Sequence, residues 1–108
     1  MLFLLDFRID YPASMSQKDL FAIWAREADA ALAAKAEGAV LGLWKCAGTR
    51  RVLAIIDADS HDTLDRVLMD LPIMSEHGQH VDVQVVPLRR YEDFADDVRE
   101  RLQRPTKV

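Results

Sequence analysis

One glutamate in the first half of the chain stands where an apolar residue is expected. Residues 16–38 are predicted to form one long helix, and at about 100° per residue its large apolar side chains fall on one broad arc. Glu27 lies inside that arc, between Ile23 and Ala31. A carboxylate that faces a core must be paired, protonated or in contact with a cavity, because burying it bare is costly. Glu27 is therefore a candidate for proton transfer in a pocket. The alternative is a carboxylate at the edge of the stripe that snorkels toward water or pairs with Arg26 or with a basic strand residue.

The other residues whose side chains could carry chemistry give weaker indications of a functional site. His61, His77 and His80 are the only histidines, and their spacing matches no metal-binding motif. Glu76 lies beside two of them, but a solvated loop explains this group better than a metal site does. No glycine-rich phosphate motif is present, so neither a metal nor a cofactor is predicted. Cys46 falls in a predicted strand, where a buried, inert thiol is expected.

Two tryptophans are candidates for contact with a small ligand. Trp24 belongs to the apolar stripe of the long helix, and Trp44 shares one face of a predicted strand with Gly42 and Cys46. Packing in the core is the alternative for both rings. Gly42 has no side chain, and the gap that it leaves predicts a pocket between the sheet and the helices.

Composition bounds the class of protein. The chain has 108 residues, of which 50% are hydrophobic and 30% charged, which suits one globular domain with a modest core. Its net charge is −4 and no basic run exceeds two residues, which argues against binding to nucleic acid. A single cysteine excludes an internal disulfide and favours a reducing, cytoplasmic compartment. The opening residues 1–7 are too short for a signal peptide or a membrane span, so no membrane is predicted.

The periodicity predicts a definite order of elements. Ser16, with Asp19 three residues later, is predicted to cap the long helix, and Pro72 is predicted to end a second one, after which a polar loop follows. Strands are predicted at residues 2–9, 39–47, 51–58 and 81–87, and helices at 16–38 and 60–71. The order β-α-β-β-α-β is that of an α+β, ferredoxin-like fold with a four-stranded antiparallel sheet and both helices on one face.

The uncovered face of that sheet predicts an oligomer. It carries enough apolar residues that leaving it in water would expose a large patch, and a dimer with two sheets packed face to face would cover it. Residues 1–88 are predicted to form the domain. Residues 89–108 differ: their apolar residues recur at helical spacing among many charges, which predicts an extra C-terminal amphipathic helix and tail that packs on a partner subunit.

At this point the chain resembles the muconolactone Δ-isomerase family over roughly residues 1–88. Glu27 matches a glutamate in the first helix of that family. The other matching positions are Met1 to Leu4, Gly38, Leu43-Trp44-Lys45, Gly48, Ile56-Asp57-Ala58, Ser60, Leu64, Leu68, Leu71-Pro72 and the segment from Asp82 to Leu88.

The resemblance implies a fold and an activity. Members have the ferredoxin-like fold, form dimeric α/β barrels that can assemble further, and need no metal or cofactor. They move a proton within a small unsaturated lactone in aromatic catabolism through the β-ketoadipate route. On this reading Glu27 is the catalytic base, assisted by His77 or His80, and the developing oxyanion and the substrate carboxylate need polar partners. The candidate substrate-binding residues are Trp24, Trp44, Lys45, Arg8 and Arg51.

The chain departs from the family at several of these positions. Trp24 and Ala28 stand where the family commonly has lysines, and Gly42 stands where it has a histidine. About four extra residues follow Leu71-Pro72, and His77 and His80 lie within that insert. These changes predict a pocket of different shape and charge.

Two other functions stay open on the sequence. One is a non-catalytic module of the same fold that binds a small ligand or serves assembly. The other is a cofactor-free monooxygenase-like member of the wider dimeric barrel group, in which the pocket orients an electron-rich aromatic compound for oxygen.

Overall fold

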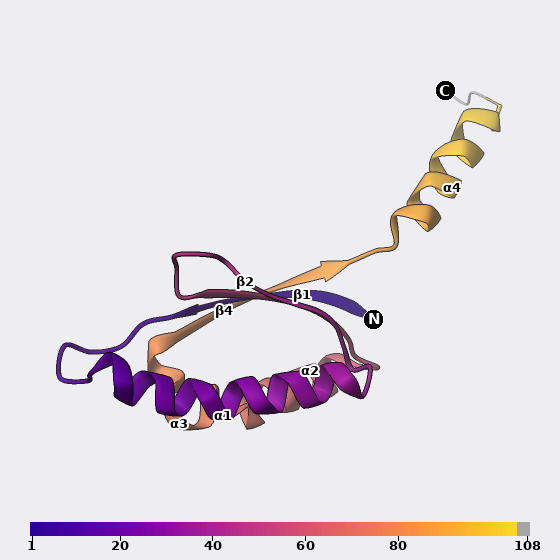
Figure 1. The fold of residues 1–108 in the computed structure, drawn as a ribbon. Helices are drawn as coiled ribbons and strands as arrows, with labels where there is room; N and C mark the ends of the chain where they lie inside the picture. Colours follow the sequence, from indigo (N-terminus) through magenta and orange to yellow (C-terminus); the bar gives the residue numbers. More distant parts are fainter. Residues whose placement is uncertain (106–108) are drawn as a thin grey trace.

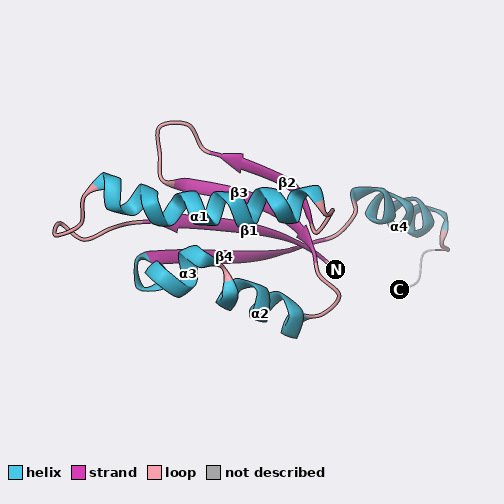
Figure 2. Cartoon of the chain, turned by 60° about the horizontal axis from the view of Figure 1, so that its bottom comes forward, coloured by secondary structure: helices cyan, strands magenta, loops and turns pink. Residues whose placement is uncertain are grey.

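The computed structural model describes residues 1–105, and it shows a sheet with helices on one face (Figures 1 and 2). The strands are β1 (Leu2–Ile9), β2 (Val40–Lys45), β3 (Arg51–Asp57) and β4 (Val81–Leu88). The helices are α1 (Gln17–Ala36), α2 (His61–Asp70), α3 (Pro72–His77) and α4 (Tyr91–Gln103), with a 3₁₀ turn at Gly78–His80. The strands pair antiparallel in the order β2-β3-β1-β4, and the sheet is open, with β2 and β4 at its edges. The predicted ferredoxin-like α+β fold is confirmed.

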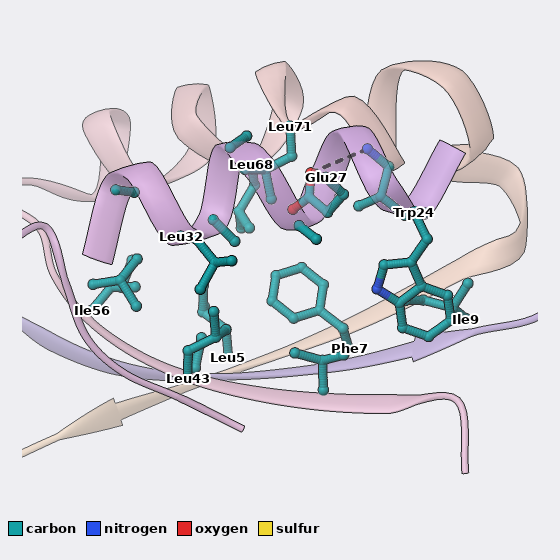
Figure 3. A pocket seen from close by; sticks show the side chains of 18 of the residues that line it. Leu5, Phe7, Ile9, Trp24, Glu27, Leu32, Leu43, Ile56, Leu68 and Leu71 are labelled. Atoms are coloured by element: carbon teal, nitrogen blue, oxygen red, sulfur yellow. Dashed lines mark hydrogen bonds between the residues drawn. The ribbon is translucent and has the colours of Figure 1, made fainter. Parts of the chain in front are cut away.

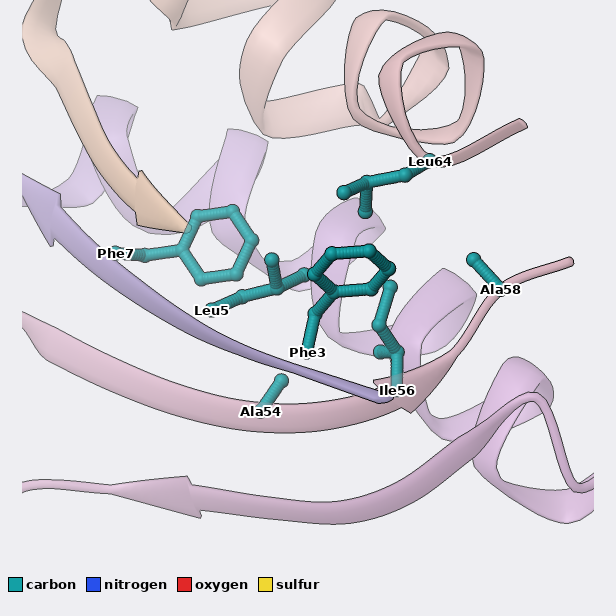
Figure 4. Close-up of a cluster of buried hydrophobic side chains, with 7 residues drawn as sticks. All are labelled: Phe3, Leu5, Phe7, Ala54, Ile56, Ala58 and Leu64. Carbon is teal, nitrogen blue, oxygen red and sulfur yellow. The ribbon is translucent and has the colours of Figure 1, made fainter. Parts of the chain in front are cut away.

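Strand β1 lies in the middle of the sheet and carries the core. Its side chains alternate between the two faces, and Phe3, Leu5 and Phe7 are at most 7% exposed on the face toward the helices. Across the sheet Phe3 pairs with Ile56 and Leu5 with Ala54, so that the same face is apolar on β3. Figure 4 shows how these side chains gather under Leu64 of α2.

On the opposite face of β1, a buried aspartate forms an ion pair with a partly exposed arginine of β3. Asp6 is only 7% exposed, and its two carboxylate oxygens accept hydrogen bonds from Nε and Nη2 of Arg51 at 2.9 and 2.8 Å. This two-point contact with Arg51 holds the pKa of Asp6 below its usual value. Arg8 pairs with Arg51 in the register of β1 and β3, so both arginines belong to the face that the helices leave uncovered.

Helix α1 begins and ends where its sequence predicts. The Ser16 hydroxyl accepts a hydrogen bond from the backbone of Asp19, whose carboxylate in turn accepts one from the backbone of Ser16, which completes the predicted capping box. The helix ends at Ala36, and Gly38 follows with φ +87°, a conformation that glycine adopts at little cost. Leu20 is fully buried and anchors the first turn.

Residues 72–80 correct one prediction. They form α3 and a 3₁₀ turn rather than a polar, solvated loop, because Pro72 occupies the first turn of α3, where proline needs no partner for its nitrogen. Ile73 and His77 of α3 are 1% and 3% exposed. His77 donates from Nε2 to the backbone oxygen of Asp10 at 2.6 Å, so its ring belongs to the core beneath α3.

Helix α4 projects away from the rest of the molecule (Figure 1). The molecule measures 64 × 28 × 24 Å, and its radius of gyration of 18.2 Å exceeds the roughly 13 Å expected of a compact domain of this length. The apolar side chains of α4 face water: Tyr91 is 74% exposed and Leu102 is 82% exposed. The predicted extra helix is therefore confirmed, and residues 106–108 of the predicted tail lie outside the described part. Within residues 1–105, no helix is both long and apolar enough to cross a membrane.

The ion pair on β1 gives a first prediction. The substitution Arg51→Met leaves the buried Asp6 carboxylate without its partner, so the melting temperature at neutral pH should fall. Because the pKa of Asp6 is lowered in the folded protein, this stabilisation is present above the ordinary pKa of an aspartate and is lost as the pH falls through the lowered value. Thermal unfolding of both proteins between neutral and strongly acidic pH should show two curves that converge in acid. Equal melting temperatures at pH 7 would contradict the role of the pair.

Candidate functional site

A large cavity separates helix α1 from the sheet (Figure 3). Its volume is about 1500 Å³, and its wall is mainly apolar, with contributions from α1, α2 and the inner face of the sheet. Phe7 and Leu5 form the floor, while Leu68 and Leu71 close the side toward α2. Sites of this kind, apolar with a few polar groups, are where small ligands bind.

Glu27 projects into this cavity from α1. Its Oε2 accepts a hydrogen bond of 3.3 Å from the backbone nitrogen of Ile73 (dashed in Figure 3). Burial raises the pKa of Glu27 above its ordinary value of 4.5, and the hydrogen bond from Ile73 offsets part of that rise. Glu27 does not pair with Arg26, which forms its ion pair with Glu76, and among residues 1–105 it forms none with a strand residue. Glu27 is only half-buried, so a carboxylate that reaches toward water at the edge of the stripe stays an alternative.

The partner of Glu27 comes from the way α3 begins. The residue before α3, Leu71, has no side chain that can cap the helix, so the first amides of α3 need another acceptor. Ile73 directly follows Pro72, and its amide is one of these groups. A carboxylate is also favoured near the positive end of a helix. In the sequence, Pro72 is the residue that indicates this contact, because proline is typical of the first turn of a helix.

Trp24 lies one helical turn before Glu27 and borders the same cavity. In Figure 3 the indole nitrogen faces the interior of the cavity, on the side of Phe7. The structure thus brings Glu27 and Trp24 together.

Trp44 and Gly42 differ from the predicted arrangement. Gly42 is opposite Ile55 and Trp44 is opposite Leu53, so both belong to the face of the sheet that the helices leave uncovered. A Cβ at Gly42 would lie 2.2 Å from Cη2 of Trp44, which means that the Trp44 ring fills the space above the glycine. The prediction that Gly42 opens a pocket toward the helices is therefore wrong, and Trp44 borders the cavity only at its edge.

Lys45 lies at the rim of the cavity. It is the last residue of β2 and is opposite Val52, on the face toward the helices. Its Nζ donates to the backbone oxygen of Cys46 at 3.2 Å. The structure thus places Lys45 at the mouth of the cavity, and its predicted contact with a ligand stays a prediction.

Four other candidates do not reach the cavity. Arg8 and Arg51 belong to the opposite face of the sheet, because they alternate with the buried residues of their strands, so their predicted contact with a substrate in this cavity is wrong. His77 is buried under α3, and His80 stacks at 4.9 Å on its ring and lines a separate small pocket with Asp10. Neither histidine lines the cavity that Glu27 borders, so the structure does not bring them together with Glu27, and their predicted assistance stays a prediction.

The cavity shows no metal ligands. Among residues 1–105, no group of three or more histidine, cysteine, aspartate or glutamate side chains is arranged to hold a metal ion.

Comparison with known proteins places the fold and the cavity in a family. Residues 1–93 match the sequence model of a family described as muconolactone delta-isomerase. The chain belongs to the muconolactone delta-isomerase family. A crystal structure of muconolactone isomerase at 3.3 Å resolution is 28% identical in sequence, with a TM-score of 0.70 over 83% of this chain and 90% of that chain. No curated protein matches the chain significantly.

Membership of the muconolactone delta-isomerase family agrees with what the cavity contains. The family match ends at residue 93, so most of α4 lies beyond it. Glu27, Trp24 and the sheet that forms the floor all lie inside the matched segment. The whole lining of the cavity therefore lies within the segment that matches the family.

The environment of Glu27 leads to a second prediction. Because burial raises its pKa, folding costs free energy when Glu27 is ionised, and stability should fall as the pH rises from the ordinary value through the raised one. Glu27→Gln removes that cost and keeps an oxygen that can accept from Ile73, so this variant should melt a few degrees above the wild type at pH 7. Differential scanning calorimetry from pH 4 to 8 should show the difference vanish toward the acid end. A variant that melts well below the wild type at pH 7 would show that the ionised carboxylate is stabilising.

Proposed function

We propose that the protein is an isomerase that moves a proton within a small unsaturated lactone or a related ring without a cofactor. The observation that carries this proposal is one carboxylate, Glu27, whose pKa is raised in an otherwise apolar cavity. A base that works near neutral pH is most effective when its pKa lies near that pH. Family membership supports the reaction class.

The chemistry follows from the acidity of the ring. Glu27 takes a proton from the ring carbon next to the carbon–carbon double bond, and the electron pair moves through that bond to the carbonyl. The intermediate is a dienolate with its negative charge on oxygen. The proton then returns from Glu27 to the carbon beside the carbonyl, two carbons away. The double bond has moved, the composition is unchanged, and no water or redox partner is consumed.

An apolar wall serves this reaction in two ways. It raises the pKa of Glu27, which makes the carboxylate a stronger base for taking the proton from the ring carbon. It also keeps out bulk water, which would otherwise exchange the proton or open the lactone. The cavity supplies both conditions from side chains such as Phe7 and Leu68.

The proposal extends to assembly. The uncovered sheet face carries Trp44, Val86 and Leu88, each at least 36% exposed, and a second sheet packed on it would bury them. Helix α4 has 13 residues and almost no contact with its own chain, and a helix of that length is marginal in water by itself. Both features support a homodimer or a larger homo-oligomer of this chain.

Activity of a Glu27 variant tests the proposed base. Glu27→Gln should lower kcat on muconolactone by about a thousandfold or more, since a neutral amide cannot accept the proton. The measurement is the change in ultraviolet absorbance without any added cofactor. Glu37→Gln is the matched control, because Glu37 is exposed at the end of the same helix and should retain full activity. Full turnover by Glu27→Gln would exclude this residue as the base.

The role of α4 is tested by one charge on its apolar stripe. Phe94→Glu should yield a smaller assembly than the wild type, because the charge would have to be buried against another copy. Glu92→Gln, an exposed change on the same helix, should leave the mass unchanged. Light scattering after gel filtration gives both masses. An unchanged mass for Phe94→Glu would mean that α4 does not contact a second copy.

A further inference from the structure

Lys45 lies at the mouth of the cavity without a carboxylate partner in the described part of its own chain. The side chain is exposed, and its Nζ donates to the backbone oxygen of the next residue, Cys46, at 3.2 Å. Among residues 1–105, none of the ion pairs includes Lys45. An ammonium group has three donors, so this single contact with a neutral carbonyl leaves Lys45 able to bind an anion.

The second cation at this mouth, Arg50, is already engaged. Its Nε donates to the backbone oxygen of Ile9 at 2.8 Å, and its Nη2 donates to the Asp10 carboxylate at 3.1 Å. Its guanidinium also lies over the ring of Tyr11, 5.4 Å from the centroid. Arg50 therefore helps to hold the mouth in shape, whereas Lys45 keeps a charge that a ligand can reach.

The register of the sheet places Lys45 in one row with Phe7. Lys45 is opposite Val52, and Val52 is opposite Phe7, so all three side chains point toward the helices. Adjacent strands are about 4.8 Å apart, which puts Lys45 about 10 Å across the sheet from Phe7. In Figure 3 the Phe7 ring points toward α1, from which Glu27 projects into the same cavity. A ligand that rests on Phe7 beside Glu27 can therefore extend along this row toward Lys45.

The polarity along this row suits a ligand with one apolar end and one anionic end. The ring of such a ligand would lie in the apolar interior, and its carboxylate would stay at the mouth, where water still reaches it. The carboxylate would thus lose little of its hydration and would gain a charge-assisted hydrogen bond from Lys45. The mouth also keeps that negative charge apart from Glu27 in the interior, which limits the repulsion between the two.

We propose that Lys45 binds the carboxylate of an acidic substrate at the mouth of the cavity and thereby sets its ring against Glu27. This inference rests on the proposed isomerase function and assigns the residue that positions the substrate for it. The substrate carboxylate replaces the Cys46 carbonyl as the partner of Nζ, and the arm that joins it to the ring determines which ring carbon faces Glu27. Lys45 is thus a substrate-binding residue that takes no part in the proton transfer.

The first experiment measures how strongly the protein prefers a charged substrate. The two substrates are a butenolide with a carboxymethyl group on the carbon that loses its proton, and the methyl ester of that acid. The wild type should show a kcat/KM about tenfold higher for the acid, the size expected of one hydrogen bond between charged groups. Lys45→Met keeps a long side chain without the charge, so this preference should disappear through a higher KM for the acid. An unchanged preference in Lys45→Met would overturn the proposal.

Two further variants show that the effect comes from the charge at this position. Lys45→Arg retains a cation and should retain most of the preference for the acid. Lys35→Met removes a charge from an exposed lysine on α1 that does not line the cavity, and the preference should stay at the wild-type value. The rate with the methyl ester should be the same in all four proteins, which shows that each variant folds. Loss of the preference in Lys35→Met as well would mean that the net charge of the protein, and not Lys45, attracts the acid.

A binding measurement separates this proposal from the isomerase function. The saturated analogues of the acid and the ester cannot isomerise, and calorimetric titration gives their dissociation constants. The saturated acid should bind more tightly than the saturated ester to the wild type and equally tightly to Lys45→Met, even if neither butenolide is turned over. Equal affinity of the two analogues for the wild type would overturn the inference, and turnover of the acid would then still support the isomerase function.

Discussion

The hydrogen bond from the Ile73 amide to Glu27 is the contact on which the site depends. It joins α1 to the start of α3, two segments that are 46 residues apart in the chain. Helix α1 packs chiefly against α3 and the edge strand β2, and the cavity lies between α1 and the middle strands of the sheet. The same bond fixes the carboxylate at the cavity wall, so the position of the proposed base and the shape of its pocket have one cause.

The sheet supports this arrangement from below. Strand β1 pairs with both β3 and β4, and its inward side chains form the floor on which a ligand would rest. On the other face of β1, Asp6 forms an ion pair with Arg51 of β3. The alternation of a β-strand thus places the apolar floor of the cavity on one face and the ion pair on the other.

Much of the fold, and the position of Glu27, could be predicted from the sequence, because they depend on local patterns. Capping at Ser16, the strand alternation and the misplaced Glu27 are all readable within a few residues. The same alternation could have excluded Arg8, which shares its face with Leu2 and Leu4 rather than with Phe7. Residues 72–80 were harder to predict. Pro72 can either end the helix before it or begin a new one, and the polar residues that follow it favoured a loop.

Other features depend on contacts between distant segments, which local patterns do not contain. The face of the sheet to which Gly42 and Trp44 belong depends on how β2 pairs with β3, where Gly42 is opposite Ile55 and Trp44 is opposite Leu53. The burial of His77 requires α3 to pack near Asp10, and the placement of Arg50 requires the turn between β2 and β3 to lie beside Tyr11. The cytoplasmic location and the pathway stay predictions from the sequence.

The most direct test of the account is the pKa of Glu27 itself. Carbon-13 NMR of the glutamate carboxyl groups, with Glu27→Gln used to assign the signal, would follow this group through a pH titration. The account predicts a midpoint above the ordinary 4.5, because the carboxylate is desolvated in an apolar cavity. A midpoint at or below the ordinary value would contradict it, since Glu27 would then be a solvated or paired carboxylate unsuited to accept and return a proton near neutral pH.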